Sequence, residues 1–409
     1  MFKRNKYKQP KLILSQNMQF EIGNPKTRRN DNVFVVGENN NCVFLTNLLE
    51  SKSNFVIYDI NGEYYKQTNS FFRENEYDVK VLDFTCGSVK EVKEDDSTSY
   101  NPFHYAKNEA DIYDIIHSFL ASQPDQFVGS LNSVEKFLAI ICAMYLYINK
   151  GNVMTFFDLF MLVKEILEDD VYKKLRYLLT EINEKSNYLA IVYNSYLNLL
   201  DQTKKEHKGA LHSLIIRLCF FNLPQEQTKI QQFISTDNVD LYNIHTKKQV
   251  IFLILKEKKL DAGINFLASI FCEQLFEAAN GVNEKELNYN VICMLNDIQK
   301  TCKNPRLNEI ITINRNFKFC FMIGCSNLTE FSKSNKDWYN ILIHCDHVIC
   351  LDDSEKDYLS IIPSNVINKK RCMKVKRFVR KNNYDCVIFV KQNKMICDIK
   401  CKLTTNEIF

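Results

Sequence analysis

Glycine, proline and tryptophan are scarce in this chain of 409 residues, which holds 10 Gly, 7 Pro and 1 Trp. So little glycine and proline leaves few flexible linkers, and we expect the domains to pack directly against each other. Long apolar runs are also lacking. The longest, residues 137–148, is too short for the about 20 apolar residues that cross a bilayer. No apolar segment follows the basic N-terminus, so we expect no secretory signal peptide.

The remaining composition is that of a globular protein, with 45% hydrophobic and 25% charged residues. The length allows two or three domains with sizeable cores. The 15 cysteines, without a signal peptide, indicate a reducing cytosol and free thiols rather than a disulfide framework. We therefore expect a cytoplasmic protein, whose only membrane contact would be peripheral, at the inner face of the cell membrane.

Positive charge is concentrated at the two ends of the chain. Residues 1–30 carry eight Lys/Arg against one Glu, and residues 364–409 carry twelve Lys/Arg against three acidic residues. Because the whole chain has a net charge of +4, residues 31–363 carry −12. Basic ends on an acidic body are able to reach anionic lipid head groups or nucleic acid. Alternatively, they are solvated termini that keep the protein soluble.

The hydrophobic periodicity changes twice along the chain. Short β-branched and aromatic runs predict strands of a parallel sheet at 33–36, 55–58 and 79–84 and again at 249–255, 291–295, 317–323 and 347–351. Between the two groups, apolar residues recur at helical spacing, which predicts an all-α insertion. The last run, 384–400, reads as a β-hairpin.

This order predicts an α/β fold that is split by an α-helical insertion. We expect five segments along the sequence. They are a basic N-terminal segment (1–30), the first part of the α/β domain (31–107), the all-α insertion (108–232), the second part of the α/β domain (233–363) and a basic C-terminal hairpin segment (364–409).

Gly37 ends the first predicted strand, where a phosphate-binding loop would begin. A loop of the pattern GxxxxGK[ST] uses glycines to aim backbone N–H groups at phosphate, a lysine to contact the phosphate and a Ser/Thr hydroxyl to hold Mg²⁺. Here Gly37 stands alone, Glu38 brings negative charge, and no lysine occurs before Lys52. The candidate nucleotide-contacting residues at this end of the site are Gly37, Asn39, Asn40 and Asn41.

Residues 291–297 (VICMLND) have the pattern of the second P-loop signature, an apolar strand followed by two acids. In that signature the first acid holds Mg²⁺ and a following Glu polarises the attacking water. Asn296 and Asp297 occupy these positions here. Asparagine has no charge to offer a hard dication, and aspartate is one methylene shorter than glutamate where geometry tolerates little displacement. Taken alone, the two residues fit a strand with a polar end equally well.

A series of short segments, each weak by itself, follows one order over about 390 residues. They are Ile13–Ser15, Lys26–Asn30, Asn32–Gly37, Asp59–Tyr64, Tyr100–Phe103, Ser235–Asp237, Asn265–Leu267, Gln274–Phe276, Trp338, Ile341–Leu342, Cys345–Asp346 and Cys386–Val390. In this order the chain resembles the cytosolic part of the type IV secretion coupling proteins, the TraG/TraD-like conjugative DNA-transfer ATPases. It is most similar to their Gram-positive conjugative-element branch.

The resemblance implies a RecA-like P-loop NTPase fold, with a mostly parallel sheet and an inserted all-α domain. In that family the domain assembles as a ring, usually hexameric, at the inner face of a conjugation channel. The ring recruits relaxase–DNA and drives it outward with ATP. The family normally has N-terminal transmembrane helices, and we expect none here.

Three parts of the family's ATPase site are missing together. The loop after Gly37 is about four residues shorter than the family pattern. The acid pair has become Asn296 and Asp297, and the family's sensing glutamine falls near Gly324, with no Gln up to Leu328. Phosphoryl transfer depends almost wholly on positioning and charge neutralisation. We therefore expect no catalytic residue, no useful turnover and no nucleotide cofactor.

Three functions fit these observations. The leading hypothesis is a degenerate coupling-protein-like subunit of a conjugative DNA-transfer or type IV secretion system, which acts by binding or assembly. Its partners would be channel proteins, an intact coupling ATPase or relaxase–DNA, in a homo-oligomer or a mixed ring. The second is an active but divergent ATPase, with ATP on the amides of Asn39–Asn41 and Mg²⁺ on Asp297. The third is a DNA-binding accessory protein that uses its basic ends.

Three other polar groups stand out. Cys325, His344–His347 and Cys350 offer zinc ligands, but no C-x₂-C pair is present and we expect no bound metal. Asp59 and Glu63 follow a predicted strand, either as remnants of a nucleotide mouth or as turn-forming residues. The basic segment Lys204–Lys208 precedes a predicted helix, and we expect it to be a solvated face.

Overall fold

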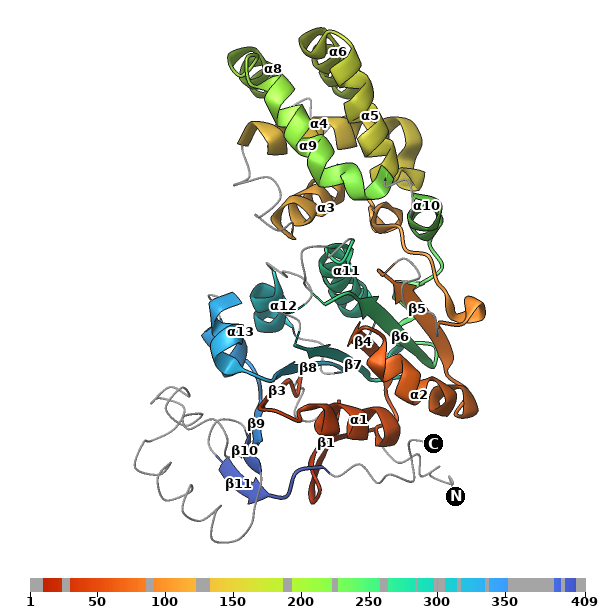
Figure 1. The fold of residues 1–409 in the computed structure, drawn as a ribbon, viewed down its shortest axis with the longest axis vertical. Coiled ribbons are helices and arrows are strands. Elements are labelled where there is room, and N and C mark those ends of the chain that lie inside the picture. The colour runs from red at the N-terminus through yellow and green to blue at the C-terminus, as the bar shows by residue number, and fades with distance from the viewer. Residues whose placement is uncertain are drawn as a thin grey trace.

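A nine-stranded sheet forms the lower part of the molecule in this computed structural model, as far as its residues are described (Figure 1). The strand order is β11-β10-β9-β3-β8-β7-β4-β6-β5, and all pairs from β9 to β5 are parallel. The structure describes residues 10–23, 30–85, 92–122, 133–186, 193–222, 227–257, 264–283, 286–297, 300, 306–314, 318–334, 338–351, 386–390 and 394–401. The basic ends therefore lie largely outside the described residues.

The seven parallel strands form where the sequence predicted them. They are β3 (Val33–Val36), β4 (Asn54–Ile60), β5 (Asp78–Asp83), β6 (Gln249–Leu255), β7 (Val291–Asn296), β8 (Phe319–Cys325) and β9 (His347–Leu351). The predicted C-terminal hairpin is also present, as β10 (Cys386–Val390) and β11 (Lys394–Asp398), which add antiparallel to β9. Near-continuous apolar runs suit strands that are covered on both faces.

Helices cover the two faces of the sheet. α1 (Asn41–Glu50) and α2 (Glu63–Glu74) lie on one face. Among the described residues, the other helices of this part are α11 (Leu267–Gly281), α12 (Leu307–Ile313), α13 (Leu328–Ser334) and α14 (Trp338–Ile343). Successive residues of β3 enter different cores, because side chains alternate along a strand. Val33 and Val35 pack with α1, whereas Phe34 and Val36 pack in the core that contains α11.

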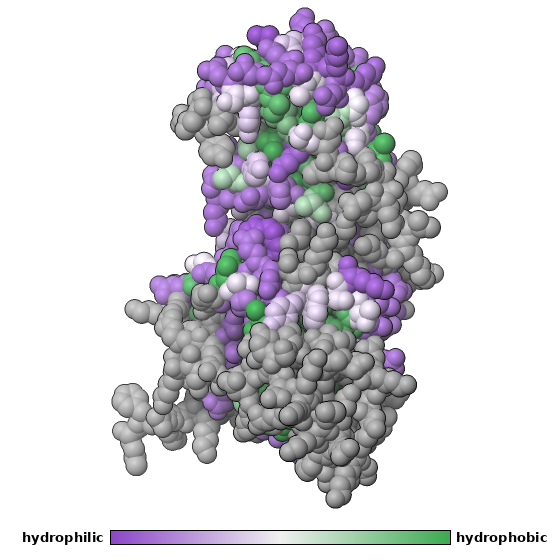
Figure 2. Space-filling model, turned by 90° about the vertical axis from the view of Figure 1, so that its left-hand side faces the viewer, coloured by the Kyte–Doolittle hydropathy of each residue, from purple (hydrophilic) through white to green (hydrophobic). Residues whose placement is uncertain are grey.

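The helical part stands above the sheet and is inserted between β5 and β6 (Figure 1). Its helices are α3 (Glu109–Ser122), α4 (Ser133–Lys150), α5 (Phe156–Glu168), α6 (Val171–Lys185), α8 (Tyr193–Gln202), α9 (His207–Leu218) and α10 (Gln227–Ser235). Glu135 on α4 and Arg217 on α9 form an ion pair of 2.6 Å, and each side chain is only 2% exposed. The upper end of this part is mostly hydrophilic on the face seen in Figure 2.

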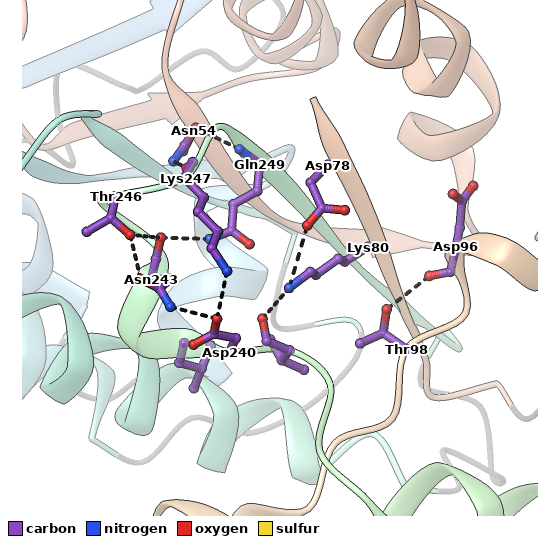
Figure 3. Close-up of polar contacts among 12 residues, drawn as sticks. Asn54, Asp78, Lys80, Asp96, Thr98, Asp240, Asn243, Thr246, Lys247 and Gln249 are labelled. Atoms are coloured by element: carbon purple, nitrogen blue, oxygen red, sulfur yellow. Dashed lines mark hydrogen bonds and ion pairs between the residues drawn. The ribbon is translucent and has the colours of Figure 1, made fainter. Parts of the chain in front are cut away.

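The chain returns from the helices to β6 through a network of polar contacts (Figure 3). The Asn54 amide donates to the carbonyls of Ile244 (2.7 Å) and Lys247 (2.6 Å), and its Oδ1 accepts from the backbone N–H of Gln249 (3.0 Å). Short 3₁₀ helices flank the insertion, η2 (Pro102–Tyr105) before it and η5 (Leu241–Asn243) after it. The connections are thus fixed by hydrogen bonds, in keeping with the shortage of glycine and proline. The residue ranges of the five predicted segments stay a prediction.

The hairpin of β1 (Lys11–Ser15) and β2 (Met18–Glu21) was not predicted from the sequence. The Asp398 carboxylate joins it to the end of β11, because it accepts from the Ser15 hydroxyl (2.6 Å) and the Asn17 amide (2.8 Å). Among the described residues, no helix has both the length and the apolar content needed to span a membrane.

Candidate functional site

The predicted site lies where β3, β7 and β8 end, at the carboxyl edge of the sheet, where open α/β sheets bind ligands. Gly37 follows β3 with φ +127°. A Cβ at this position would lie 2.5 Å from the carbonyl oxygen of Leu351 at the end of β9. The glycine is therefore required by backbone packing alone, without reference to a phosphate.

The loop after Gly37 is short. Helix α1 begins at Asn41, so only Glu38, Asn39 and Asn40 separate it from the glycine. The first helical N–H groups already bond to backbone carbonyls, that of Cys42 to Asn39 (3.2 Å) and that of Val43 to Asn40 (3.0 Å). In a phosphate-binding loop such N–H groups point at the anion. Here they tighten the start of the helix instead.

Side chains from three elements meet in front of this helix. The Asn296 amide nitrogen, at the end of β7, lies 2.7 Å from Oδ1 of Asn41, 3.1 Å from Oδ1 of Asn40 and 2.9 Å from the Tyr64 hydroxyl. The Tyr64 hydroxyl in turn donates to Oδ1 of Asn41 (2.7 Å). Asn40, Tyr64 and Asn296 are buried. We call these four residues the amide cluster; it joins α1, α2 and β7 through uncharged groups.

Gly324 lies beside Asn296 in the register of β8 and β7. A Cβ on Gly324 would be 2.2 Å from Oδ1 of Asn296 and 2.8 Å from the ring of Phe44 in α1. The position where the family resemblance places a sensing glutamine thus has no room for a side chain. Phe44 and the amide cluster occupy that volume.

Asp297 is engaged by groups of its own loop and the next. Its carboxylate accepts from Lys300 Nζ (2.8 Å), from the backbone N–H of Ser326 (2.8 Å) and from the Ser326 hydroxyl. Burial acts to raise the pKa of Asp297, but the hydrogen bonds from Lys300 and Ser326 outweigh it and lower that pKa. Lys300 was not singled out from the sequence, although its i, i+3 spacing from an acid was a usable signal.

Asp59 lies one residue before the end of β4 and accepts from the backbone N–H groups of Tyr64 (2.9 Å) and Tyr65 (2.7 Å) at the start of α2. It is fully buried, and burial raises its pKa to about 7. This geometry is that of a residue that holds a turn and a helix start. A cavity of about 230 Å³ lies beside it, lined by four carboxylates (Asp59, Glu63, Glu257 and Asp297) and by Lys300, with Asn41, Tyr58, Ile60, Asn61, Tyr64 and Asn296.

The structure brings Asn40, Asn41 and Asn296 together in the amide cluster. Gly37 and Asp297 both lie next to the end of β8. The N–H of Gly37 donates to the carbonyl of Cys325 (3.0 Å), and that of Asp297 donates to the carbonyl of Gly324 (2.9 Å). Asn39 forms the turn before α1, with φ +63°. Sequence reasoning missed Tyr64, Phe44, Lys300 and Ser326, which complete the site from other segments.

The candidate zinc ligands do not converge. His347 pairs with Val33 at the start of β3, whereas Cys325 and Cys350 flank Val36 at its end. Within the described residues, no three His, Cys, Asp or Glu side chains are placed to hold a metal ion. In the basic segment, Lys204 Nζ lies 4.1 Å from the centre of the Tyr172 ring.

Residues 38–364 match the sequence profile of the type IV secretory system conjugative DNA transfer family. The chain belongs to this family. Its function is therefore coupling-protein-like, in conjugative DNA transfer or type IV secretion. No curated protein matches the chain in sequence.

Solved structures show the same fold for this member of the conjugative DNA transfer family. The plasmid coupling protein TrwB with the GTP analogue GDPNP has a TM-score of 0.63 at 12% identity, covering 93% of this chain and 88% of that one. TrwB with ADP and Mg²⁺ has a TM-score of 0.57 at 12% identity, covering 92% and 79%. VirB4 of Thermoanaerobacter pseudethanolicus has a TM-score of 0.59 at 11% identity, covering 98% of both chains. The predicted RecA-like P-loop NTPase fold is confirmed.

Proposed function

We propose that this conjugative DNA transfer family member acts by binding and assembly, without ATP hydrolysis. The observation that carries the proposal is the amide cluster. Asn296 bonds Asn40, Asn41 and Tyr64 at the point where a P-loop and its acidic partner would hold phosphate and Mg²⁺. A ligand that binds at this point has to displace these hydrogen bonds.

The residues present do not fit a nucleotide with Mg²⁺. Mg²⁺ prefers octahedral oxygen ligands that include carboxylates. The Asn296 amide turns its N–H groups toward the cluster, and the Asp297 carboxylate is held by Lys300 and Ser326. The adjacent cavity is lined by four carboxylates against one lysine, but among the described residues no three of these carboxylates are placed to hold one metal ion. Such a cavity repels a triphosphate rather than attracting it.

The partners follow from the family and belong to this proposal. The chain joins channel proteins or an intact coupling ATPase, as a homo-oligomer or as one subunit of a mixed ring, and contacts relaxase–DNA there. Its membrane contact is peripheral or supplied by these partners. Ring contacts do not need hydrolysis, so the fold is able to keep them after the chemistry is lost.

A binding isotherm with labelled ATP and Mg²⁺ on the full chain tests the first half of the proposal. We expect no saturation up to millimolar ATP and no release of phosphate. Asn296→Asp, which restores an acid to β7, is the matched variant and should leave both results unchanged, since the loop still lacks its lysine. Micromolar affinity with turnover in the unmodified chain would overturn the proposal and favour a divergent ATPase.

Assembly is tested separately, by co-expressing the chain with an intact coupling ATPase and measuring particle mass in solution. We expect rings that contain both chains, or rings of this chain alone, whether or not ATP is present. A chain that stays monomeric and binds neither the ATPase nor a channel protein would contradict the assembly role.

A further inference from the structure

A second cavity, of about 70 Å³, lies between the helical part and the sheet part. Its walls come from α3 on one side and α11 on the other, with η2, η5 and Arg306 closing the ends. It shares no lining residue with the cavity beside Asp59. The amide cluster and the proposed loss of catalysis therefore leave it without an assigned role.

Carboxylates dominate the walls of this cavity. Asp111 and Asp114 lie three residues apart on α3, and Glu273 and Glu277 lie four residues apart on α11, so each pair occupies one face of its helix. Lys107 and Arg306 supply positive charge. Arg306 is shared between Glu273 (3.4 Å) and Glu309 (3.2 Å). The four carboxylates of the cavity wall therefore outnumber the positive charges that face them.

Glu273 is the buried member, with 6% of its surface exposed. Its Oε2 accepts from the Ser118 hydroxyl (2.6 Å) and from Arg306. Its Oε1 is buried and has no hydrogen-bond partner among the described residues. A buried carboxylate oxygen without a donor is unfavourable, because it has given up its hydrogen bonds to water without a replacement. Oε1 of Glu273 therefore lacks a hydrogen-bond donor.

Aromatic rings form another wall. Tyr105 and Tyr242 both line the cavity, with ring centroids 5.7 Å apart. Lys107 Nζ already lies 5.4 Å from the centre of the Tyr242 ring. Carboxylates next to aromatic faces suit an organic cation, which gains both ion pairing and cation–π attraction. A metal ion fits less well, because the described carboxylates do not converge on one point.

We propose that this cavity binds the guanidinium or ammonium head of an arginine or lysine side chain of a partner protein. The volume suits a side-chain head, since it equals the liquid volume of about two waters. One N–H of the cation donates to Oε1 of Glu273, and Glu277 pairs with its charge at the rim. The bound residue contacts α3 and α11 together, and so joins the helical part to the sheet part.

Ethylguanidinium and ethylurea test the proposal on the full chain, because they have the same shape and only the first is charged. We expect saturable binding of ethylguanidinium by calorimetry and none of ethylurea. Glu277→Gln, at the exposed rim, and Glu273→Gln, in the wall, should each weaken binding at least about tenfold. Glu165→Gln is the matched control, because it removes an exposed carboxylate of α5 that does not line the cavity, and it should leave affinity unchanged.

N-acetyl-arginine amide and spermidine distinguish the source of the cation. Tighter binding of the arginine derivative supports a protein partner, and tighter binding of spermidine overturns that part in favour of a free polyamine. Equal binding of ethylurea, or an unchanged affinity in folded Glu277→Gln, would overturn the cation site itself. Circular dichroism of each variant establishes that it is folded.

Discussion

Oδ1 of Asn296 packs against Gly324, at 2.2 Å from where a Cβ of that glycine would stand. The two residues lie side by side on β7 and β8, and the contact places the Asn296 nitrogen toward α1 and α2. The asparagine at 296 and the glycine at 324 therefore depend on each other. A side chain at 324 and the amide cluster exclude each other.

Gly324→Ala should destabilise the protein by about 1–3 kcal/mol, because the added methyl overlaps Asn296 and the Phe44 ring. Gly209→Ala is the matched control. Gly209 lies within α9 with no atom within 4 Å of an added Cβ, so alanine should stabilise by about 0.5–1 kcal/mol through helix propensity. Urea unfolding of both variants measures the difference. Equal effects would contradict the packing at 324.

Gly37→Ala should lower the free energy of unfolding by more than the strain of a positive φ alone would cause. The residue has φ +127° and its Cβ would meet the Leu351 carbonyl at 2.5 Å. Gly151→Ala supplies the comparison, since Gly151 has φ +65° in open space. We expect about 1 kcal/mol for Gly151→Ala and at least about 2 kcal/mol more for Gly37→Ala, by denaturant unfolding. Loss of nucleotide binding would play no part in either value.

Asp59 should make stability fall as pH rises. Burial raises its folded pKa to about 7, whereas an unfolded aspartate titrates near about 3.9. Between these values the folded state holds the extra proton, so the stabilisation is complete below about pH 4 and is lost as pH rises through about 7. The slope is at most about 1.4 kcal/mol per pH unit.

Denaturant unfolding of Asp59→Asn at several pH values checks this. The variant should show a shallower fall than the unmodified protein, although Glu273, whose pKa burial raises to about 6, still contributes in the same direction. Asp78→Asn, at an exposed carboxylate, controls for the loss of one charge. An identical pH dependence in Asp59→Asn would refute the assignment.

The buried pair of Glu135 and Arg217 should behave differently when one or both partners are changed. Glu135→Gln removes the negative charge that faces the buried guanidinium of Arg217 and should cost about 3–5 kcal/mol. Replacing both, as Glu135→Leu with Arg217→Met, should recover most of that loss. Glu181→Gln, which breaks the exposed pair with Lys185, should cost less than about 1 kcal/mol. Thermal unfolding of these three variants and of the unmodified protein measures the differences in stability.

The strands and most helices were predictable because their periodicity is local. The runs at 33–36, 249–255 and 347–351 appear as strands with these bounds. Helices α1, α2, α10, α12, α13 and α14 were not predicted from the sequence. The short loop after Gly37 was predicted from the sequence. The side chains of α1 and α2 that fill the site were not, because these two helices were not predicted.

The amide cluster depends on contacts that no local pattern encodes. Tyr64 and Asn296 are 232 residues apart, and their hydrogen bond exists only because β4 and β7 are neighbours in the sheet. Asn296 and Asp297 were identified from their place after an apolar strand. Their partners, Tyr64 and Ser326, required the fold.

The position of β3 between β8 and β9 has a consequence for synthesis of the chain. Val33–Val36 leaves the ribosome before its hydrogen-bonding partners, which are residues 322–325 and 347–350. Until those are made, β3 has two open edges, and exposed edges invite aggregation. The helical part, built from contacts close in sequence, is free to fold meanwhile. The central strand β3 therefore stays unpaired until β8 and β9 have been synthesised. A chaperone that shields β3 during this time would raise the yield of folded protein.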